Sequence, residues 1–131
     1  MKAGIETLSV TTMVPKGKLP RLPFLELKNA ILGKRYELSI VFTTPAHSRR
    51  LNRTHRGKDK PANVLSFALS PRSGELVLCQ STARKEAPAF GMSERRFLSY
   101  LLIHGMLHLK GFAHGSTMEN KEELFLKKFS L

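Results

Sequence analysis

Three of the chain's five histidines fall within one stretch of eleven residues, in the pattern H-x3-H-x5-H. His104 and His108 are four residues apart, so on a helix they lie one turn apart on the same face. Gly111 favours a helix end, because glycine readily adopts the left-handed conformation found there, and the turn that follows can bring His114 back toward the other two. Three imidazoles that converge in this way suit a tetrahedral zinc ion with one coordination position open to water.

The helix expected to carry the first two histidines is apolar on nearly all sides, which predicts that it is buried. Four of its side chains fall within one narrow sector at about 100° per residue: Phe97, Leu101, His104 and His108. Two neighbouring histidines on a buried face need partners for their ring nitrogens, and a shared metal ion satisfies both. The alternative is a pair of core histidines with one hydrogen bond each.

The histidine spacing resembles that of the metzincin proteases, H-E-x-x-H-x-x-G-x-x-H, with a difference at one position. Gly105 follows the first histidine, where those proteases have the glutamate that serves as general base. A glycine has no side chain that can take or give a proton. The sequence therefore disfavours a zinc hydrolase of peptides or small amides, which remains as an alternative.

The length of the chain and its single cysteine limit the remaining choices. A chain of 131 residues is expected to form one domain, residues 1–131, around one core. Cys79 has no second cysteine to pair with, which fits a reducing compartment. The first residues lack an apolar core of signal-peptide length, and no run reaches the length that crosses a bilayer. We therefore expect a cytoplasmic protein without a membrane partner.

Apolar periodicity, β-branched residues and turn residues predict eight elements. They are a strand at 5–13, a helix at 24–32, a strand at 36–43, a helix at 45–55, strands at 63–69 and 75–79, the histidine helix after Ser93, and a terminal helix at 116–129. A helical extension and an irregular loop fill 81–92. Thr44 and Ser93 are suitable N-caps, and Ser116 with Glu119 has the form of a capping box.

This order, β-α-β-α-β-β-α-α, predicts an α/β (α+β) fold: a mixed, mostly four-stranded sheet with helices packed against it and a metzincin-like zinc helix. The two strands joined by the short turn at 70–74 must be antiparallel, whereas strands joined through helices are expected to be parallel.

The chain is strongly basic, with 22 Lys and Arg against 10 Asp and Glu and a net charge of +12. This excess favours a polyanionic partner, although a basic surface that only aids solubility is the alternative. Residues 47–60 contain one acid and six Lys and Arg side chains, five of which are candidate contacts to an RNA backbone: Arg49, Arg50, Arg53, Lys58 and Lys60. The sixth, Arg56, lies at the predicted helix end, from which it can reach over the sheet toward a site.

Two stretches resemble the signatures of the bacterial YbeY endoribonuclease family. Residues 51–67, LNRTHRGKDKPANVLSF, resemble its LNxxYRxxDxPTDVLSF signature, and residues 104–114 resemble HGxLHLxGYDH, including the glycine after the first histidine. Between them, residues 74–77 resemble the family's strand entry. This resemblance implies a single-strand-specific, zinc-dependent endoribonuclease that acts in 3′-end maturation of 16S ribosomal RNA and in ribosome quality control, with single-stranded RNA and the small ribosomal subunit as partners.

Carried over by position, the resemblance implies that His104, His108 and His114 bind one zinc ion and that Arg56 is the functional arginine, with no other cofactor. The sequence departs from the family at Phe112-Ala113, where Tyr-Asp is usual. Glu75 is the only candidate for a general base, if its strand ends near the metal. The alternative class is a non-catalytic ribosome or RNA-binding factor with a structural zinc. Its fourth ligand would be one of three residues: Cys79, His47 or His55.

Overall fold

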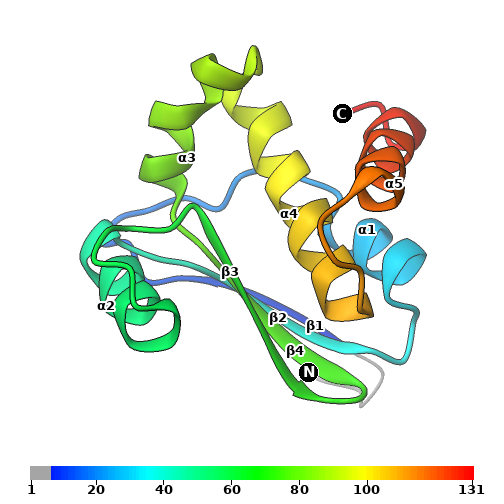
Figure 1. Cartoon of the computed structure of the whole chain (residues 1–131), viewed down its shortest axis with the longest axis horizontal. Coiled ribbons are helices and arrows are strands. Elements are labelled where there is room, and N and C mark those ends of the chain that lie inside the picture. The colour runs from blue at the N-terminus through cyan, green and yellow to red at the C-terminus, as the bar shows by residue number, and fades with distance from the viewer. Residues whose placement is uncertain (1–6) are drawn as a thin grey trace.

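The computed structural model describes residues 7–131, in which four strands form one mixed sheet in the order β1-β2-β4-β3 (Figure 1). The strands are β1 (Leu8–Thr12), β2 (Glu37–Phe42), β3 (Val64–Ser70) and β4 (Ser73–Leu78). β2 runs parallel to both β1 and β4, and β3 is antiparallel to β4. This arrangement confirms the predicted α+β class and leaves β3 at one edge of the sheet.

One long helix lies across the sheet and holds the core together. The helices are α1 (Phe24–Ile31), α2 (Pro45–Arg56), α3 (Gln80–Glu86), the 3-10 helix η1 (Ala87–Phe90), α4 (Glu94–Lys110) and α5 (Ser116–Lys128). Helix α4 contacts β3, β4 and four of the other helical elements, and Figure 1 shows it between α5 and α3. Its residues Phe97, Leu102 and Met106 are fully buried, as its nearly continuous apolar sequence predicts.

Strand β4 alternates between the two faces of the sheet. Leu76 and Leu78 are completely buried in the core on the α4 side, whereas Glu75 and Val77 line a hollow on the other side together with Leu51 of α2. Successive residues of a strand point to opposite faces. The sheet therefore separates α2 from the histidine helix.

The predicted helix ends are mostly confirmed. The Thr44 hydroxyl accepts from the backbone N–H of His47 and the Ser93 hydroxyl from that of Arg96. Gly57 and Gly111 both take left-handed conformations, with φ of 68° and 111°, where glycine has no Cβ penalty.

The prediction of a capping box formed by Ser116 and Glu119 is wrong. A capping box requires its serine to precede the helix, but Ser116 is the first residue of α5 and Gly115 is the N-cap, without a side-chain cap bond.

Strand direction also differs from one expectation. β1 and β2, joined through α1, are parallel as predicted. β2 and β3, joined through α2, are not, because β4 lies between them, parallel to β2 and antiparallel to β3. The turn between β3 and β4 is tighter than predicted, with two residues between the strands. The strand expected at 5–13 begins at Leu8, and residues 5 and 6 lie outside the described part of the chain.

No helix within residues 7–131 has the length and apolar character needed to span a membrane.

Candidate metal centre and its cavity

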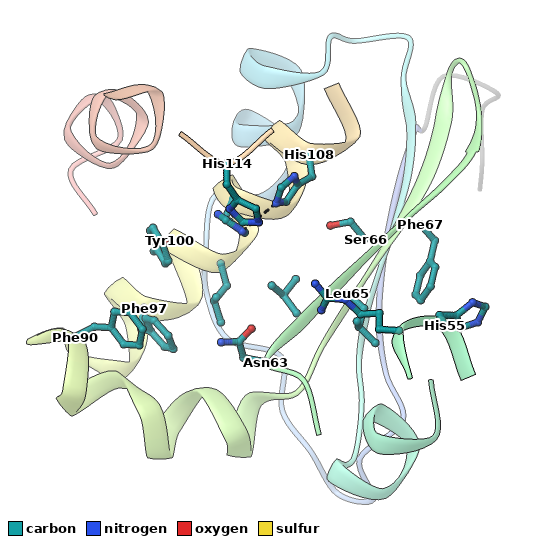
Figure 2. A pocket seen from close by; sticks show the side chains of 14 residues that line it. His55, Asn63, Leu65, Ser66, Phe67, Phe90, Phe97, Tyr100, His108 and His114 are labelled. Carbon is teal, nitrogen blue, oxygen red and sulfur yellow. Dashed lines mark hydrogen bonds between the residues drawn. The ribbon is translucent and has the colours of Figure 1, made fainter. Parts of the chain in front are cut away.

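Three imidazoles meet at the C-terminal end of α4. One nitrogen from each of His104, His108 and His114 lies within 4.8 Å of those of the other two. The ring centroids are 4.5 Å apart for His108 and His114, and Figure 2 shows these two side chains side by side. Gly111 ends α4, and the Phe112 N–H donates to the Leu107 carbonyl at 3.0 Å. The chain turns back there as the sequence predicts, so that His114 reaches the other two rings.

Hydrogen bonds fix the orientation of two of the rings. Nδ1 of His104 lies 2.5 Å from Oε2 of Glu122, and Nδ1 of His108 lies 3.0 Å from the carbonyl oxygen of Phe112. A carboxylate and a carbonyl only accept, so both Nδ1 atoms carry the proton. In the neutral rings both Nε2 atoms are then acceptors, whereas a protonated His104 would donate from Nε2 to His108.

These two Nε2 atoms face each other at 3.1 Å. Two lone pairs at that distance repel unless a cation lies between them. Zinc–nitrogen bonds of about 2.0–2.1 Å place neighbouring tetrahedral ligands about 3.3–3.4 Å apart. The spacing and the donor set therefore fit a zinc ion.

The surroundings favour the neutral form of His108, which is the form that binds metal. Burial lowers the pKa of His108 below its usual 6.5, and the neighbouring His104 and His114 lower it further, whereas the hydrogen bond to Phe112 opposes them. His114 is exposed while the other two are half-buried. The group is therefore anchored in the protein on one side and reachable from the other.

A cavity of about 600 Å³ opens beside the three histidines. It is lined by α4, β3, η1 and the end of α2, which contributes Arg56. Figure 2 labels several of its side chains, among them His55, Ser66, Phe90, Phe97 and Tyr100. Arg56 is exposed and comes to this cavity from α2, as the sequence predicts. Among the described residues 7–131 that line it, none is a carboxylate.

Glu75 is therefore not a general base for this centre. Its side chain lines the hollow on the opposite face of the sheet, with Val41 and Val77. The register of β4 explains this, because the neighbouring Leu76 points to the α4 side, where it approaches Gly105. A one-residue difference along a strand reverses the face.

None of the three residues considered as a fourth ligand joins the histidine group. Among residues 7–131, that group contains only the three histidines. Cys79 is completely buried and accepts from the Thr82 hydroxyl at 3.2 Å. His47 lines the other face of the sheet, and His55 lies at the cavity edge with its ring 4.9 Å from that of Phe67.

The five basic residues predicted to contact RNA lie outside the cavity lining and are all exposed. Two of them already have a partner: Arg49 makes a bidentate pair with Asp59 (Nε–Oδ1 2.7 Å, Nη2–Oδ2 2.9 Å), and Arg53 lies 3.4 Å from the same carboxylate. Arg50 contacts the ring of His47.

Sequence reasoning missed Glu122, the buried carboxylate behind His104. Only 5% of Glu122 is exposed, although it is a charged residue on a surface helix. A signal was present, since Met118, Glu122 and Leu126 recur every four residues and form the buried face of α5. An acid in line with an apolar face requires a buried partner.

The chain is similar in sequence to members of one known protein family and in fold to one solved structure. The model of the family described as Endoribonuclease YbeY matches residues 22–130. The Endoribonuclease YbeY of Geobacillus kaustophilus is 36% identical over an alignment of 115 residues, and the match covers 72% of this chain and 74% of the relative. That of Chromobacterium violaceum is 42% identical over an alignment of 94 residues, and the match covers 66% of this chain and 56% of the relative. The solution structure of TM1509 from Thermotoga maritima matches with a TM-score of 0.63 and 25% identity, over 93% of this chain and 88% of that one.

Proposed function

Because this chain belongs to the YbeY family of endoribonucleases, we propose that it is a single-strand-specific endoribonuclease that hydrolyses RNA phosphodiester bonds with one zinc ion. His104, His108 and His114 would hold the ion. The observation that supports the metal is that the Nε2 atoms of His104 and His108 lie 3.1 Å apart, each on a ring whose Nδ1 already has a hydrogen-bond partner. That arrangement is typical of imidazoles prepared as metal ligands.

The residues around the histidines hold the ligands in place. Glu122 and the Phe112 carbonyl fix the orientations of the His104 and His108 rings. When bound, zinc supplies a Lewis acid for a phosphoryl oxygen and lowers the pKa of water toward ~7. The exposed side of His114 and the cavity beside it leave room for a phosphate and its attacking water.

Arg56 is the residue that we expect to bind the scissile phosphate. It is the only Lys or Arg residue among those that line the cavity in the described part of the chain. A guanidinium donates two parallel hydrogen bonds to a phosphate and keeps its charge at every physiological pH. It would stabilise the negative charge that builds on the phosphoryl oxygens as the bond breaks.

The basic residues outside the cavity would bind the RNA strand by its phosphates, with little reading of sequence. We propose that the substrate is single-stranded ribosomal RNA, that the reaction matures the 3′ end of 16S rRNA and serves ribosome quality control, and that the small ribosomal subunit is a partner. Such a substrate would place the protein in the cytoplasm. The net charge of +12 supports a polyanionic partner of this kind.

A nuclease assay on single-stranded and duplex RNA tests the proposal, with metal content measured on the same samples. His108→Ala should lose both zinc and cleavage. Arg56→Ala should keep zinc and lose roughly 10²–10³-fold in cleavage rate, as expected for removal of one donor to the reacting group. Cleavage that survives both changes would come from a contaminant. Zinc binding without any cleavage would favour a non-catalytic RNA-binding factor.

A further inference from the structure

Three aromatic rings continue from the metal centre to the outer rim of the cavity. The ring of Tyr100 lies 5.7 Å from that of His104, the ring of Phe97 lies 6.0 Å from Tyr100, and the ring of Phe90 lies 4.8 Å from Phe97. Phe97 is nearly parallel to both neighbours, at 26° to Phe90 and 16° to Tyr100. Figure 2 shows Phe90 beside Phe97, with Tyr100 between Phe97 and the histidines.

The outermost ring, that of Phe90, is not a core residue. Phe90 is 57% exposed although it lines the cavity, while Phe97 behind it is completely buried. A phenylalanine exposed to this extent gains little from burial within its own chain. Since Phe97 covers one face of the ring, the exposure leaves the other face available to a ligand.

The backbone holds this ring in a defined place. Phe90 is the last residue of η1, which has Pro88 near its start and Gly91 in the left-handed conformation at its end. The Gly91 and Met92 N–H groups close that turn on the carbonyls of Pro88 and Ala87. A ring fixed in this way, with a second ring stacked behind it, loses little conformational freedom when a flat ligand stacks on it.

We infer that Phe90 is the platform on which an unpaired base of the RNA strand stacks, at the rim of the cavity that also contains the metal centre. This inference rests on the proposed function and names one binding contact of the same cavity. Nucleobases stack on aromatic side chains irrespective of sequence, because every base has a π-face. Arg56 lines the same cavity and would bind the backbone of the strand whose base stacks on Phe90.

The inference also accounts physically for a preference for single strands. A base within a duplex is already stacked on both sides and cannot place its face on Phe90 unless the duplex opens. The binding free energy of the platform is therefore available only to an unpaired nucleotide. Phe90 would contribute mainly to substrate binding and not to the bond-breaking step.

The chain contains no tryptophan, so Phe90→Trp creates a single fluorescent reporter at the proposed contact. Addition of a single-stranded oligonucleotide should quench its emission, whereas Leu124→Trp on α5, at a position that is 55% exposed and outside the cavity lining, should change little. The titration is done with zinc absent, so that no cleavage occurs. Equal responses at both positions, or no response at Phe90→Trp, would overturn the inference.

Cleavage kinetics give the second measurement. Phe90→Ala should raise KM by roughly 5- to 150-fold, the range that one base–aromatic contact covers, with kcat nearly unchanged and Phe90→Tyr close to the wild type. A series of substrates, each with an abasic nucleotide at a different position, should contain one that raises the KM of the wild type by a similar factor. The same substrate should raise the KM of Phe90→Ala no further. An abasic loss that is just as large in Phe90→Ala would refute the platform.

These measurements separate the two ideas. If RNA quenches the emission of Phe90→Trp but the wild-type protein cleaves no RNA, the platform stands and the nuclease proposal fails. If the wild type cleaves single-stranded RNA and Phe90→Ala has the same KM, the nuclease proposal stands and the platform fails.

Discussion

Glu122 of α5 accepts a hydrogen bond from Nδ1 of His104 on α4, with Nδ1 and Oε2 2.5 Å apart and the carboxylate 95% buried from solvent. Eighteen residues separate the two positions in the chain. The contact makes the docking of α5 on α4 part of the metal centre, because the carboxylate sets which nitrogen of His104 faces the other histidines.

Replacing this carboxylate should weaken metal binding more than it weakens the fold. Glu122→Gln keeps the size and the hydrogen-bond acceptor of the side chain and removes the charge, so we expect zinc affinity to fall about 10- to 100-fold, measured by competition with a chelator. Glu123→Gln, at the exposed neighbouring position, is the matched control and should bind like the wild type. Equal affinities for the two variants would mean that Glu122 has no part in binding the metal.

Zinc should stabilise the folded protein. A ligand that binds only the folded state adds about 2.7 kcal/mol at a free concentration 100 times its Kd, so zinc should raise Tm by several degrees. Magnesium should not, because it prefers oxygen ligands. His108→Ala should abolish the shift, and a shift that persists in this variant would place the zinc elsewhere.

The same experiment has a predicted pH dependence. Burial and the neighbouring histidines lower the pKa of His108 in the fold below its unfolded value of 6.5. Between these two pKa values the unfolded chain binds more protons, so the metal-free protein should lose stability as the pH falls below 6.5. Zinc needs the neutral ring, and proton competition at His108 therefore begins only below that pH. A Tm of the metal-free protein that does not fall as the pH drops below 6.5 would contradict the lowered pKa of His108.

Gly105 should not accept the glutamate that metal peptidases have at this position. A Cβ added at Gly105 would lie 2.7 Å from Cδ2 of Leu76 and 3.2 Å from Oγ of Ser66, so the position faces the sheet and not the cavity. Gly105→Glu should bury an unpaired charge against completely buried Leu76 and cost about 3 kcal/mol or more. Arg95→Glu, at an exposed position of the same helix, is the control. A stable Gly105→Glu protein with peptidase activity would refute this account.

Much of the fold and the metal centre could be predicted because the signals are local. The spacing of His104 and His108, the left-handed glycine at 111 and the N-caps at Thr44 and Ser93 depend only on neighbouring residues. Short-range sequence patterns report such geometry directly.

The features that were missed depend on contacts between distant segments. Because β4 lies between β2 and β3, β3 runs antiparallel to β2 and not parallel to it as expected. The sequence of the turn between β3 and β4 cannot show which strand pairs with the other edge of β4. Glu122 meets His104 only because α5 packs on α4. Glu75 pointed away from the centre because the register of β4 set its face, which a composition argument does not reveal.

Lys28 is a further residue that only the fold explains, since it is completely buried. Its Nζ atom lies within hydrogen-bond distance of four acceptors, the Thr7 hydroxyl and the carbonyls of Gly33, Lys34 and Tyr36, which share its three protons. These contacts tie α1 to the segments that lead into β1 and β2. Lys28→Met removes these hydrogen bonds from a buried site and should cost about 2–4 kcal/mol in the free energy of unfolding, measured with urea. Lys34→Met, at an exposed position, should cost little. Equal losses would show that the bonds of Lys28 contribute nothing specific.

The ion pair between Arg49 and Asp59 should compete with RNA. Asp59 occupies both donors of the Arg49 fork and also reaches Arg53, and the hydrogen bond from Arg49 is the main cause that lowers the pKa of Asp59. Asp59→Asn should free both arginines for phosphates, tighten binding of single-stranded RNA at low salt, and steepen the slope of log K against log salt by about 0.7 for each added contact. Fluorescence anisotropy over a salt series measures the slope.

Combining Asp59→Asn with Arg49→Ala separates the two arginines in that experiment. If Arg49 contacts the strand, the double variant should lose the contact that Asp59→Asn gained and keep only what Arg53 adds. If neither arginine contacts RNA, Asp59→Asn leaves the slope of log K against log salt unchanged. The binding surface then lies on the side of Arg50, Lys58 and Lys60, and replacing these residues with alanine should make the slope shallower. Because the Arg49–Asp59 pair is exposed on both sides, its loss should hardly change Tm, so a change in RNA affinity would report the contact itself.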